Sequence, residues 1–241
     1  MGRKAFLTLL LLLCGLSAFP QILKDTTFIS AAIQNTANLY HKAIGAQARL
    51  YNGSKYLAPD HTLEQHPYFL SEDWIMGDVF YDGEAFRQVP LMLDLYNGQL
   101  ITEHYSSGHA IQLVKEKLHH FTIEGHYFEK IENDSVAGSL PQTDFYDILH
   151  GGTTKLVAKR QKFIREQIVS NVVERSFDDR NRYFLFKNGV YFPVKSKSSV
   201  LKLMSDRKQE MKKFLKQQPE STTKNRELLM KSLAEYYDTL K

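Results

Sequence analysis

Two histidines and a glutamate lie close together in the segment 61–66 (HTLEQH), and zinc accepts both residue types as ligands. A zinc site needs its ligands to converge on one point. On a helix His66 points away from His61 and Glu64, and on a strand His61 lies opposite the other two. The bracketing prolines favour a loop, and the spacing differs from the HExxH pattern of zinc peptidases. We therefore expect an exposed polar loop, and His61, Glu64 and His66 remain the candidate metal ligands.

The segment 150–155 (HGGTTK) combines histidine, glycine, hydroxyl groups and lysine, as oxyanion-binding and phosphate-binding loops also do. It lacks the Gly-Lys-Ser/Thr order of a phosphate-binding loop. The chain also has no Gly-x-Ser-x-Gly motif to supply the serine of a hydrolase. We expect a turn between two strands, while His150 joins His61, Glu64 and His66 in an alternative hypothesis of a hydrolase site assembled from loops.

Three further histidines, at 119, 120 and 126, flank a predicted hairpin that turns at Glu124-Gly125. In this hairpin His120 faces Glu129, which predicts a polar cross-strand pair on a solvated face. A functional histidine cluster is the alternative.

Two pairs of neighbouring acidic residues, Glu72-Asp73 and Asp178-Asp179, have turn-like polar surroundings in the sequence. Adjacent residues of a strand point to opposite faces, so neither pair forms a catalytic dyad by proximity alone. We expect solvated charges at both places.

The N-terminus has the layout of a secretory signal peptide. Arg3 and Lys4 precede the largely apolar run 5–19, which is shorter than the roughly 20 residues of a membrane-spanning helix. We predict a signal peptide at residues 1–18, export to the periplasm or cell envelope, and no membrane span after its removal. Cys14 raises the alternative of a lipid anchor, but Leu13 is larger than the residue that usually precedes a lipidated cysteine.

Cys14 is the only cysteine of the chain. Its loss with the signal would exclude a disulfide framework, a thiolate zinc site and a cysteine nucleophile in the mature protein. We expect residues 19–241 to form a single β-rich domain, with no cofactor.

Positive charge is concentrated near the C-terminus, where the stretch 195–216 holds eight Lys or Arg and only two acidic residues. Such charge attracts anionic lipid, surface polysaccharide or nucleic acid through long-range fields. Export argues against nucleic acid as the partner. If the stretch 195–216 forms a basic helix, its partner would be an envelope protein or an anionic surface. The simpler interpretation is that its charges lie on a solvated helix face.

Hydrophobic periodicity predicts a helix over 27–44, where Ile29, Ile33 and Tyr40 belong to an apolar stripe that would pack on a sheet. Strands follow, joined by two-residue turns at 82–83, 97–98 and 188–189. The first turn would place Met76 opposite Val89. The second would place Leu95 opposite Leu100 on a face that points to the core, together with the two leucines at 91 and 93.

The hairpin 182–194 is apolar on both faces and therefore needs cover on both sides. Pro193 cannot donate to a strand ladder, so its strand is expected at a sheet edge. Residues 155–163 read as one strand followed by a mixed stretch to 179. Two helices, 199–216 and 225–240, are predicted to end the chain, forming a helical segment from about 198 to 241.

An ordered set of motifs resembles a group of uncharacterised exported proteins from Bacteroidota-type bacteria. The resemblance covers most of the mature chain and implies a bacterial cell-envelope context, with no activity, cofactor or catalytic residue to carry over. Its motifs are Leu50-Tyr51-Asn52-Gly53, Tyr81-Asp82-Gly83, Val89-Pro90-Leu91-Met92-Leu93-Asp94, Phe145-Tyr146-Asp147-Ile148-Leu149 and Pro193-Val194-Lys195-Ser196-Lys197.

Together these patterns predict an α+β fold: an antiparallel, meander-rich β-sheet assembly with an N-terminal helix and a C-terminal helical pair. The favoured function is a non-enzymatic binding or interaction protein of the cell envelope. A hydrolase and a structural envelope component anchored at its N-terminus are the alternatives.

Overall fold

The structure is a computed structural model and describes residues 26–45, 48–59, 63, 65–132 and 140–240. The chain divides into two units, Met1–Ala43 and Ile44–Lys241. The predicted signal peptide with Cys14, and the candidate ligands His61 and Glu64, lie outside the described residues.

The first unit contributes helix α2 (Thr26–Ile44), which confirms the helix predicted for 27–44. The chain leaves the helix at Gly45, whose φ of +47° is a conformation that glycine adopts without steric cost. Ile29, Ile33 and Tyr40 of the predicted apolar stripe are exposed, and the packing of this stripe on a sheet stays a prediction.

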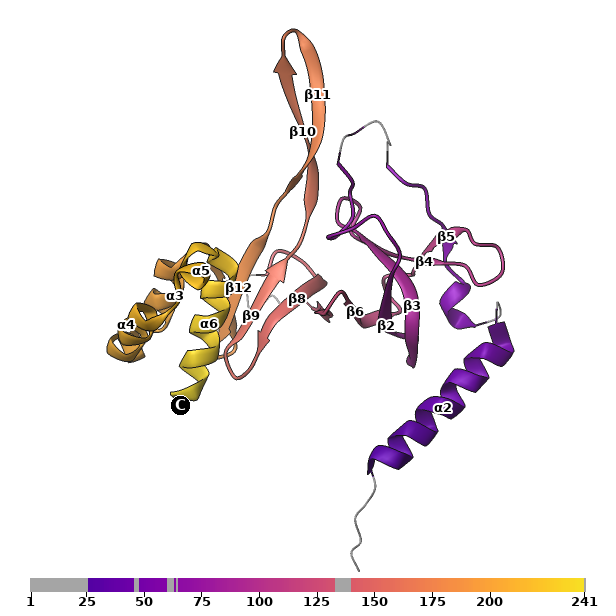
Figure 1. The fold of residues 1–241 in the computed structure, drawn as a ribbon, viewed down its shortest axis with the longest axis horizontal. Coiled ribbons are helices and arrows are strands. Elements are labelled where there is room, and N and C mark those ends of the chain that lie inside the picture. Colours follow the sequence, from indigo (N-terminus) through magenta and orange to yellow (C-terminus); the bar gives the residue numbers. More distant parts are fainter. Residues whose placement is uncertain (1–25, 46–47, 60–62, 64, 133–139, 241) are drawn as a thin grey trace, which may run out of the picture. The chain divides into compact units, whose positions relative to one another are not determined.

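The second unit is built on an 11-stranded antiparallel sheet, shown in Figure 1. Strands that follow one another in sequence are neighbours in most of the sheet, which confirms the predicted α+β class with a meander. The spatial order is β1 (Ser54–Lys55), β5 (Ala110–Gln112), β4 (Gln99–Glu103), β3 (Glu84–Asp94), β2 (Ile75–Tyr81), β6 (Leu118–Ile123), β7 (His126–Ile131), β8 (Asp144–Gly151), β9 (Lys155–Lys159), β12 (Arg182–Lys187) and β13 (Val190–Val194).

The predicted two-residue turns at 82–83 and 188–189 are confirmed, and both residues of each turn have positive φ. The register after the first turn is corrected by one residue, because Met76 faces Pro90 and not Val89. A β-bulge causes the shift: two residues of β3 oppose the single residue Asp78 of β2. Asp78 Oδ1 accepts the Gln88 N–H at 3.1 Å and so stabilises the bulge.

The prediction of a two-residue turn at 97–98 is wrong: β3 and β4 are joined by the four-residue loop 95–98, and Leu100 faces Leu93 instead of Leu95. The buried Asp94 explains the longer loop, since its Oδ1 accepts the N–H groups of residues 96 and 97 at 2.8 and 2.9 Å. A shift of two residues keeps every side chain on its face. The four predicted leucines therefore do share one buried core cluster.

The β12–β13 hairpin is covered on both faces, as its sequence requires. Tyr183, Leu185 and Val194 pack in a core cluster with the C-terminal helices, while Phe184 and Tyr191 belong to a second cluster on the other face. β13 is the last strand of the sheet, which confirms the edge position expected from its proline.

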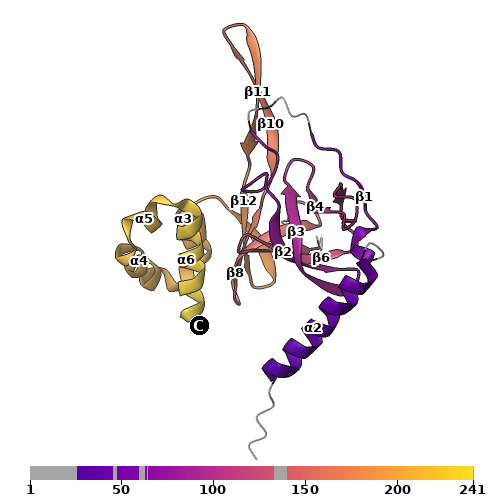
Figure 2. The same cartoon turned by 45° about the vertical axis from the view of Figure 1, so that its right-hand side comes forward.

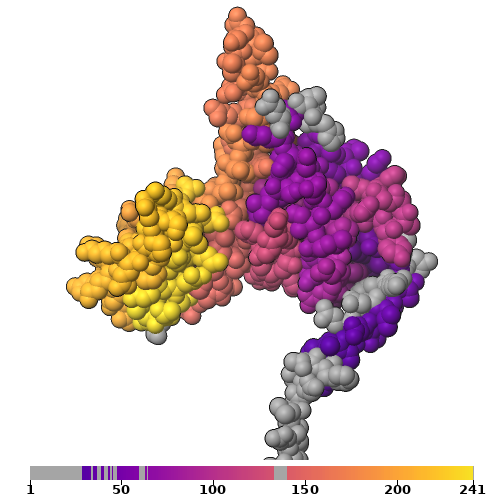
Figure 3. Space-filling view, in the orientation of Figure 1, coloured from indigo at the N-terminus to yellow at the C-terminus, as the bar shows by residue number. Residues whose placement is uncertain are grey.

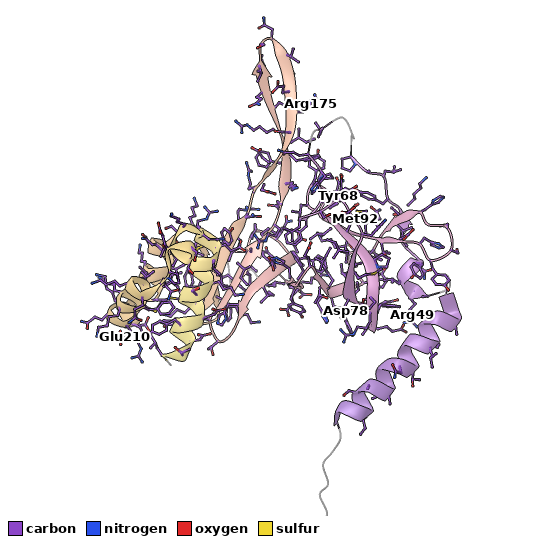
Figure 4. All side chains as sticks on the ribbon, viewed as in Figure 1. Arg49, Tyr68, Asp78, Met92, Arg175 and Glu210 are labelled. Carbon is purple, nitrogen blue, oxygen red and sulfur yellow. The ribbon has the colours of Figure 1, made fainter. Side chains whose placement is uncertain are left out.

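A separate two-stranded sheet consists of β10 (Lys162–Val169) and β11 (Val172–Asp179), inserted between the neighbouring strands β9 and β12. The single strand predicted for 155–163 is therefore divided, because the buried Arg160 interrupts it. Eight cross-strand pairs run without a bulge, and the outer half of the hairpin is exposed on both faces (Figures 1 and 3). Figure 4 labels Arg175 in this outer half.

Helices α3 (Lys197–Leu203), α4 (Lys208–Gln217), α5 (Glu220–Lys224) and α6 (Arg226–Thr239) follow the sheet and gather together in Figures 1 and 2. Their apolar side chains pack with those of β9, β12 and β13. The predicted helix 199–216 is interrupted by a 3₁₀ turn at Ser205–Arg207. Asp206 of this turn accepts hydrogen bonds from Lys187 of β12 and Tyr237 of α6, at 2.8 and 2.7 Å, which ties the break to its neighbours.

Candidate functional site

Of the three candidate metal ligands, the structure describes only His66. Among the residues that it describes, no group of three or more His, Cys, Asp or Glu side chains is arranged to hold a metal ion. The metal site over 61–66 therefore stays a prediction.

His66 lines a pocket of about 410 Å³ between the sheet, the root of the β10–β11 hairpin and the start of α6. Polar and charged side chains make up most of its wall. The lining residues are His66, Phe69, Leu70, Leu95, His126, Arg160, Lys162, Asp179, Asn181 and Glu227. We call this space the His66 pocket.

The His66 imidazole stacks near the Tyr68 ring at 6.0 Å between centroids. Its buried Nδ1 atom has no hydrogen-bond partner among the described residues. Burial lowers the pKa of His66, and the charge of Lys162 lowers it further, so the ring is neutral at pH 7. Lys162 Nζ in turn donates to the carbonyl oxygen of His66 at 2.8 Å and fixes the loop at the hairpin root.

Arg160 lines the pocket and donates hydrogen bonds to two carboxylates, those of Asp147 and Glu227. Its Nε and Nη2 both donate to Asp147 Oδ2, at 2.9 and 2.6 Å, and its Nη1 and Nη2 donate to the two oxygens of Glu227, at 2.6 and 2.8 Å. Burial alone would lower the pKa of Arg160, but the hydrogen bonds and charges of Glu227 and Asp147 raise it above its ordinary value. The guanidinium, which directly follows β9, thus joins β8 to α6 through one cation with five donors.

The second carboxylate of this network, Glu227, also accepts a hydrogen bond from the Tyr183 hydroxyl at 2.8 Å. Burial would raise the pKa of Glu227, but hydrogen bonds to Arg160 and its charge hold it below the ordinary value. Glu227 lies in the first turn of α6, which Asn225 caps by accepting the N–H of Leu228. The carboxylate is therefore ionised and held in one orientation.

His126, the first residue of β7, lies within hydrogen-bond distance of the same network, with Nδ1 2.9 Å from Asp147 Oδ2. Its ring meets the edge of Phe69 at 5.0 Å between centroids. A carboxylate on one ring nitrogen orients the imidazole and leaves the other nitrogen for a further contact. His126 can accordingly bind a polar group or move a proton at the pocket wall.

The other histidines of the predicted hairpin do not join this site. His120 faces Glu129, as predicted, and its ring stacks on Phe80 at 5.2 Å. The alternative of one functional histidine cluster stays a prediction, and the observed contact of His126 is with Asp147.

His150 takes part in a separate contact that fastens the C-terminal helix. Its Nε2 lies 2.9 Å from Asp238 Oδ2, and Asp238 also accepts the N–H of Thr154 at 2.9 Å. The segment forms the turn between β8 and β9, as predicted. A Cβ atom at Gly152 would lie 2.1 Å from Asp238 Oδ2, so a side chain at this position would displace the Asp238 carboxylate.

Sequence analysis missed Arg160, Asp147 and Glu227, which lie far apart along the chain. Asp179 is exposed, as expected, and it also lines the pocket, while its neighbour Asp178 pairs with Arg165 on the opposite face at 3.4 Å. Strand alternation therefore separates the two carboxylates, as predicted. Leu70, at the rim of the pocket, has a φ of +60°. A bulky residue rarely adopts this backbone conformation, and the sequence alone does not predict it.

No family model, curated protein or solved structure matches the chain. No helix of the described residues is both long and apolar enough to cross a membrane.

Proposed function

We propose that the chain is an exported, non-enzymatic binding protein of the bacterial cell envelope whose His66 pocket holds a small polar ligand. The observation that carries this proposal is the lining of the pocket, in which Lys162 supplies donors and Asp179 and Glu227 supply acceptors.

The ion pairs of Arg160 with Asp147 and Glu227 support the binding of a ligand, because they fix the side chains of the pocket wall before the ligand arrives. Arg160 already holds Asp147 and Glu227, so these groups need not be ordered when a ligand arrives. Lower ordering costs favour affinity. Lys162 can face an acceptor on the ligand, while Asp179 and Glu227 can face donors.

NMR titration with a panel of small polar compounds, including glutamate, glucose and succinate, tests the proposal. A compound that binds should shift the ring signals of His66 and His126, and the shifts should be lost in Asp179→Asn. The exposed His109 provides the matched control, and His109→Gln should leave the titration unchanged. Binding that leaves both pocket histidines unaffected would contradict the proposal.

The export part of the proposal rests on residues 1–18 and on the resemblance to exported Bacteroidota-type proteins. Intact-mass measurement of the protein from bacterial cells should give a chain that begins after Ala18. A mass that includes a lipid on Cys14, or the whole N-terminus, would favour the anchored structural component instead.

A hydrolase remains the second candidate, and the His126–Asp147 contact is the observation that favours it. A histidine oriented by a carboxylate can act as a general base on water. Hydrolysis of p-nitrophenyl acetate that is lost in His126→Gln and retained in His109→Gln would support this candidate. Equal, slow hydrolysis by all three proteins would remove it.

A further inference from the structure

A second hollow, of about 360 Å³, opens beside the edge strand β13. Its floor is apolar: Tyr183, Phe184 and Val194 are buried there, and Pro141 and Pro193 flank them. We call it the β13 hollow. Its size lies at the lower end of the range for small-molecule sites, which are apolar cavities with a few convergent polar groups.

Three exposed cations, Arg182, Lys195 and Arg226, surround this apolar floor, and no acidic residue lines it. Arg182 Nη2 donates to the neutral side chain of Gln161 at 2.9 Å, and the Arg226 guanidinium lies 5.3 Å from the centre of the Tyr183 ring. None of the three forms an ion pair with an acidic residue of the described chain, in contrast to the buried Arg160.

We propose that the β13 hollow binds an anionic amphiphile, a carboxylate or phosphate group joined to a short apolar chain. Arginine recognises both anions through paired N–H donors, and a lysine adds a point charge. The apolar chain would cover the exposed Pro141 and Pro193, beside the buried Phe184 and Val194. This site is separate from the His66 pocket, and the proposal does not depend on the function assigned to that pocket.

An extended peptide that adds to β13 is the other occupant to consider at a sheet edge. Such a peptide needs a regular series of N–H donors and carbonyl acceptors along the strand. Pro193 has no N–H and interrupts that series in the middle of the hollow. The combination of converging cations with this interruption favours the amphiphile.

Isothermal titration calorimetry with octyl phosphate, octanoate, inorganic phosphate and octylammonium tests the site at low salt. We expect octyl phosphate to bind at least about tenfold more tightly than inorganic phosphate, because burial of methylene groups adds to the ionic contact. Octylammonium should not bind. Equal affinity of the two phosphates, or binding of octylammonium, would overturn the proposal.

Arg226→Gln and Lys195→Gln should each weaken octyl phosphate binding at least threefold, while Lys202→Gln on α3 serves as the control and should bind normally. Unchanged thermal midpoints would show that the variants are folded. Affinities equal to wild type in both variants would overturn the proposal. Sedimentation with phosphatidylglycerol vesicles that is weaker in Arg226→Gln than in Lys202→Gln would identify the source as a membrane lipid, whereas binding of octyl phosphate without this difference indicates a free amphiphile.

Discussion

Arg160 places two of its nitrogen atoms, Nε and Nη2, on a single oxygen of Asp147, at 2.9 and 2.6 Å. Both side chains are almost wholly buried, with 7% and 1% exposure. Burial of charge is unfavourable unless a partner compensates it, so each group depends on the other. Since Arg160 also holds Glu227, this contact joins the sheet to the C-terminal helices.

Arg160→Met should lower the free energy of unfolding by about 3–5 kcal/mol, because it leaves Asp147 buried without its cation. Urea unfolding followed by circular dichroism measures the change. The exposed pair Arg165–Asp178, at 3.4 Å, offers the matched control. Arg165→Met should cost less than about 1 kcal/mol. Equal losses in the two variants would contradict a structural role for the buried network.

Acid should destabilise the protein through Asp144. Burial raises the pKa of this carboxyl, but hydrogen bonds from Lys115 and Lys159 outweigh it and lower the pKa from 3.8 to about 2. A depressed folded-state pKa gives stability that is present above the unfolded pKa and lost as pH falls through the folded one. We expect about 2 kcal/mol to disappear between about pH 4 and pH 2.

Asp144→Asn tests this dependence, since asparagine has no proton to gain. Its unfolding free energy should be lower than that of wild type at neutral pH, and the two proteins should converge toward pH 2. The measurement is urea unfolding at several pH values. A constant difference between the proteins across this range would contradict the assignment to Asp144.

Local patterns were sufficient to predict two of the three turns at 82–83, 97–98 and 188–189 and the strands that they join, because these depend on neighbours in sequence. The turn at 188–189 and the edge position of Pro193 follow from backbone chemistry alone. The loop at 95–98 could not be predicted in this way. Its length depends on Asp94, whose buried carboxylate also accepts the hydroxyl of Tyr56 at 2.8 Å, from a residue far away in sequence.

The His66 pocket could not be predicted from the sequence either, because it too depends on contacts between residues that lie far apart in the chain. Arg160 and Glu227 meet across 67 positions of the chain, and neither has a spacing that predicts the other. The β10–β11 hairpin was missed because its outer half is exposed on both faces, so its apolar residues do not alternate against a core. A strand without a buried face gives only a weak pattern.

The backbone conformation of Leu70, at the rim of the His66 pocket, should lower the free energy of unfolding. Its backbone has a φ of +60°, which costs a residue with a Cβ atom about 1–2 kcal/mol, and its side chain is 57% exposed. Leu70→Asn should therefore raise the unfolding free energy by about 1 kcal/mol, because asparagine tolerates this conformation. Leu57→Asn, at another exposed leucine, is the control and should bring no gain.

The lysines of α4 should bind an anionic membrane surface through electrostatic attraction. Sedimentation with vesicles that contain phosphatidylglycerol should weaken strongly as salt rises from about 0.05 M to about 0.5 M, because the Debye length shortens. Replacing Lys212, Lys213 and Lys216 by Gln should reduce binding. The same replacement at three lysines of the sheet, Lys55, Lys130 and Lys155, provides the control. Binding that does not change with salt would contradict the electrostatic attraction.

The tip of the β10–β11 hairpin should limit solubility without adding stability. Ile168 and its cross-strand partner Val173 are 77% and 56% exposed. Replacing both by threonine keeps β-branched side chains, so the unfolding free energy should change by less than about 0.5 kcal/mol per site while solubility rises.

Ile164 provides the control for this prediction. It lies on the same strand face but pairs with the buried Phe177, and Ile164→Thr should destabilise the protein. Thermal unfolding and precipitation with ammonium sulfate measure the two properties. Equal loss of stability at the tip and at Ile164 would show that the tip is packed and not exposed in solution.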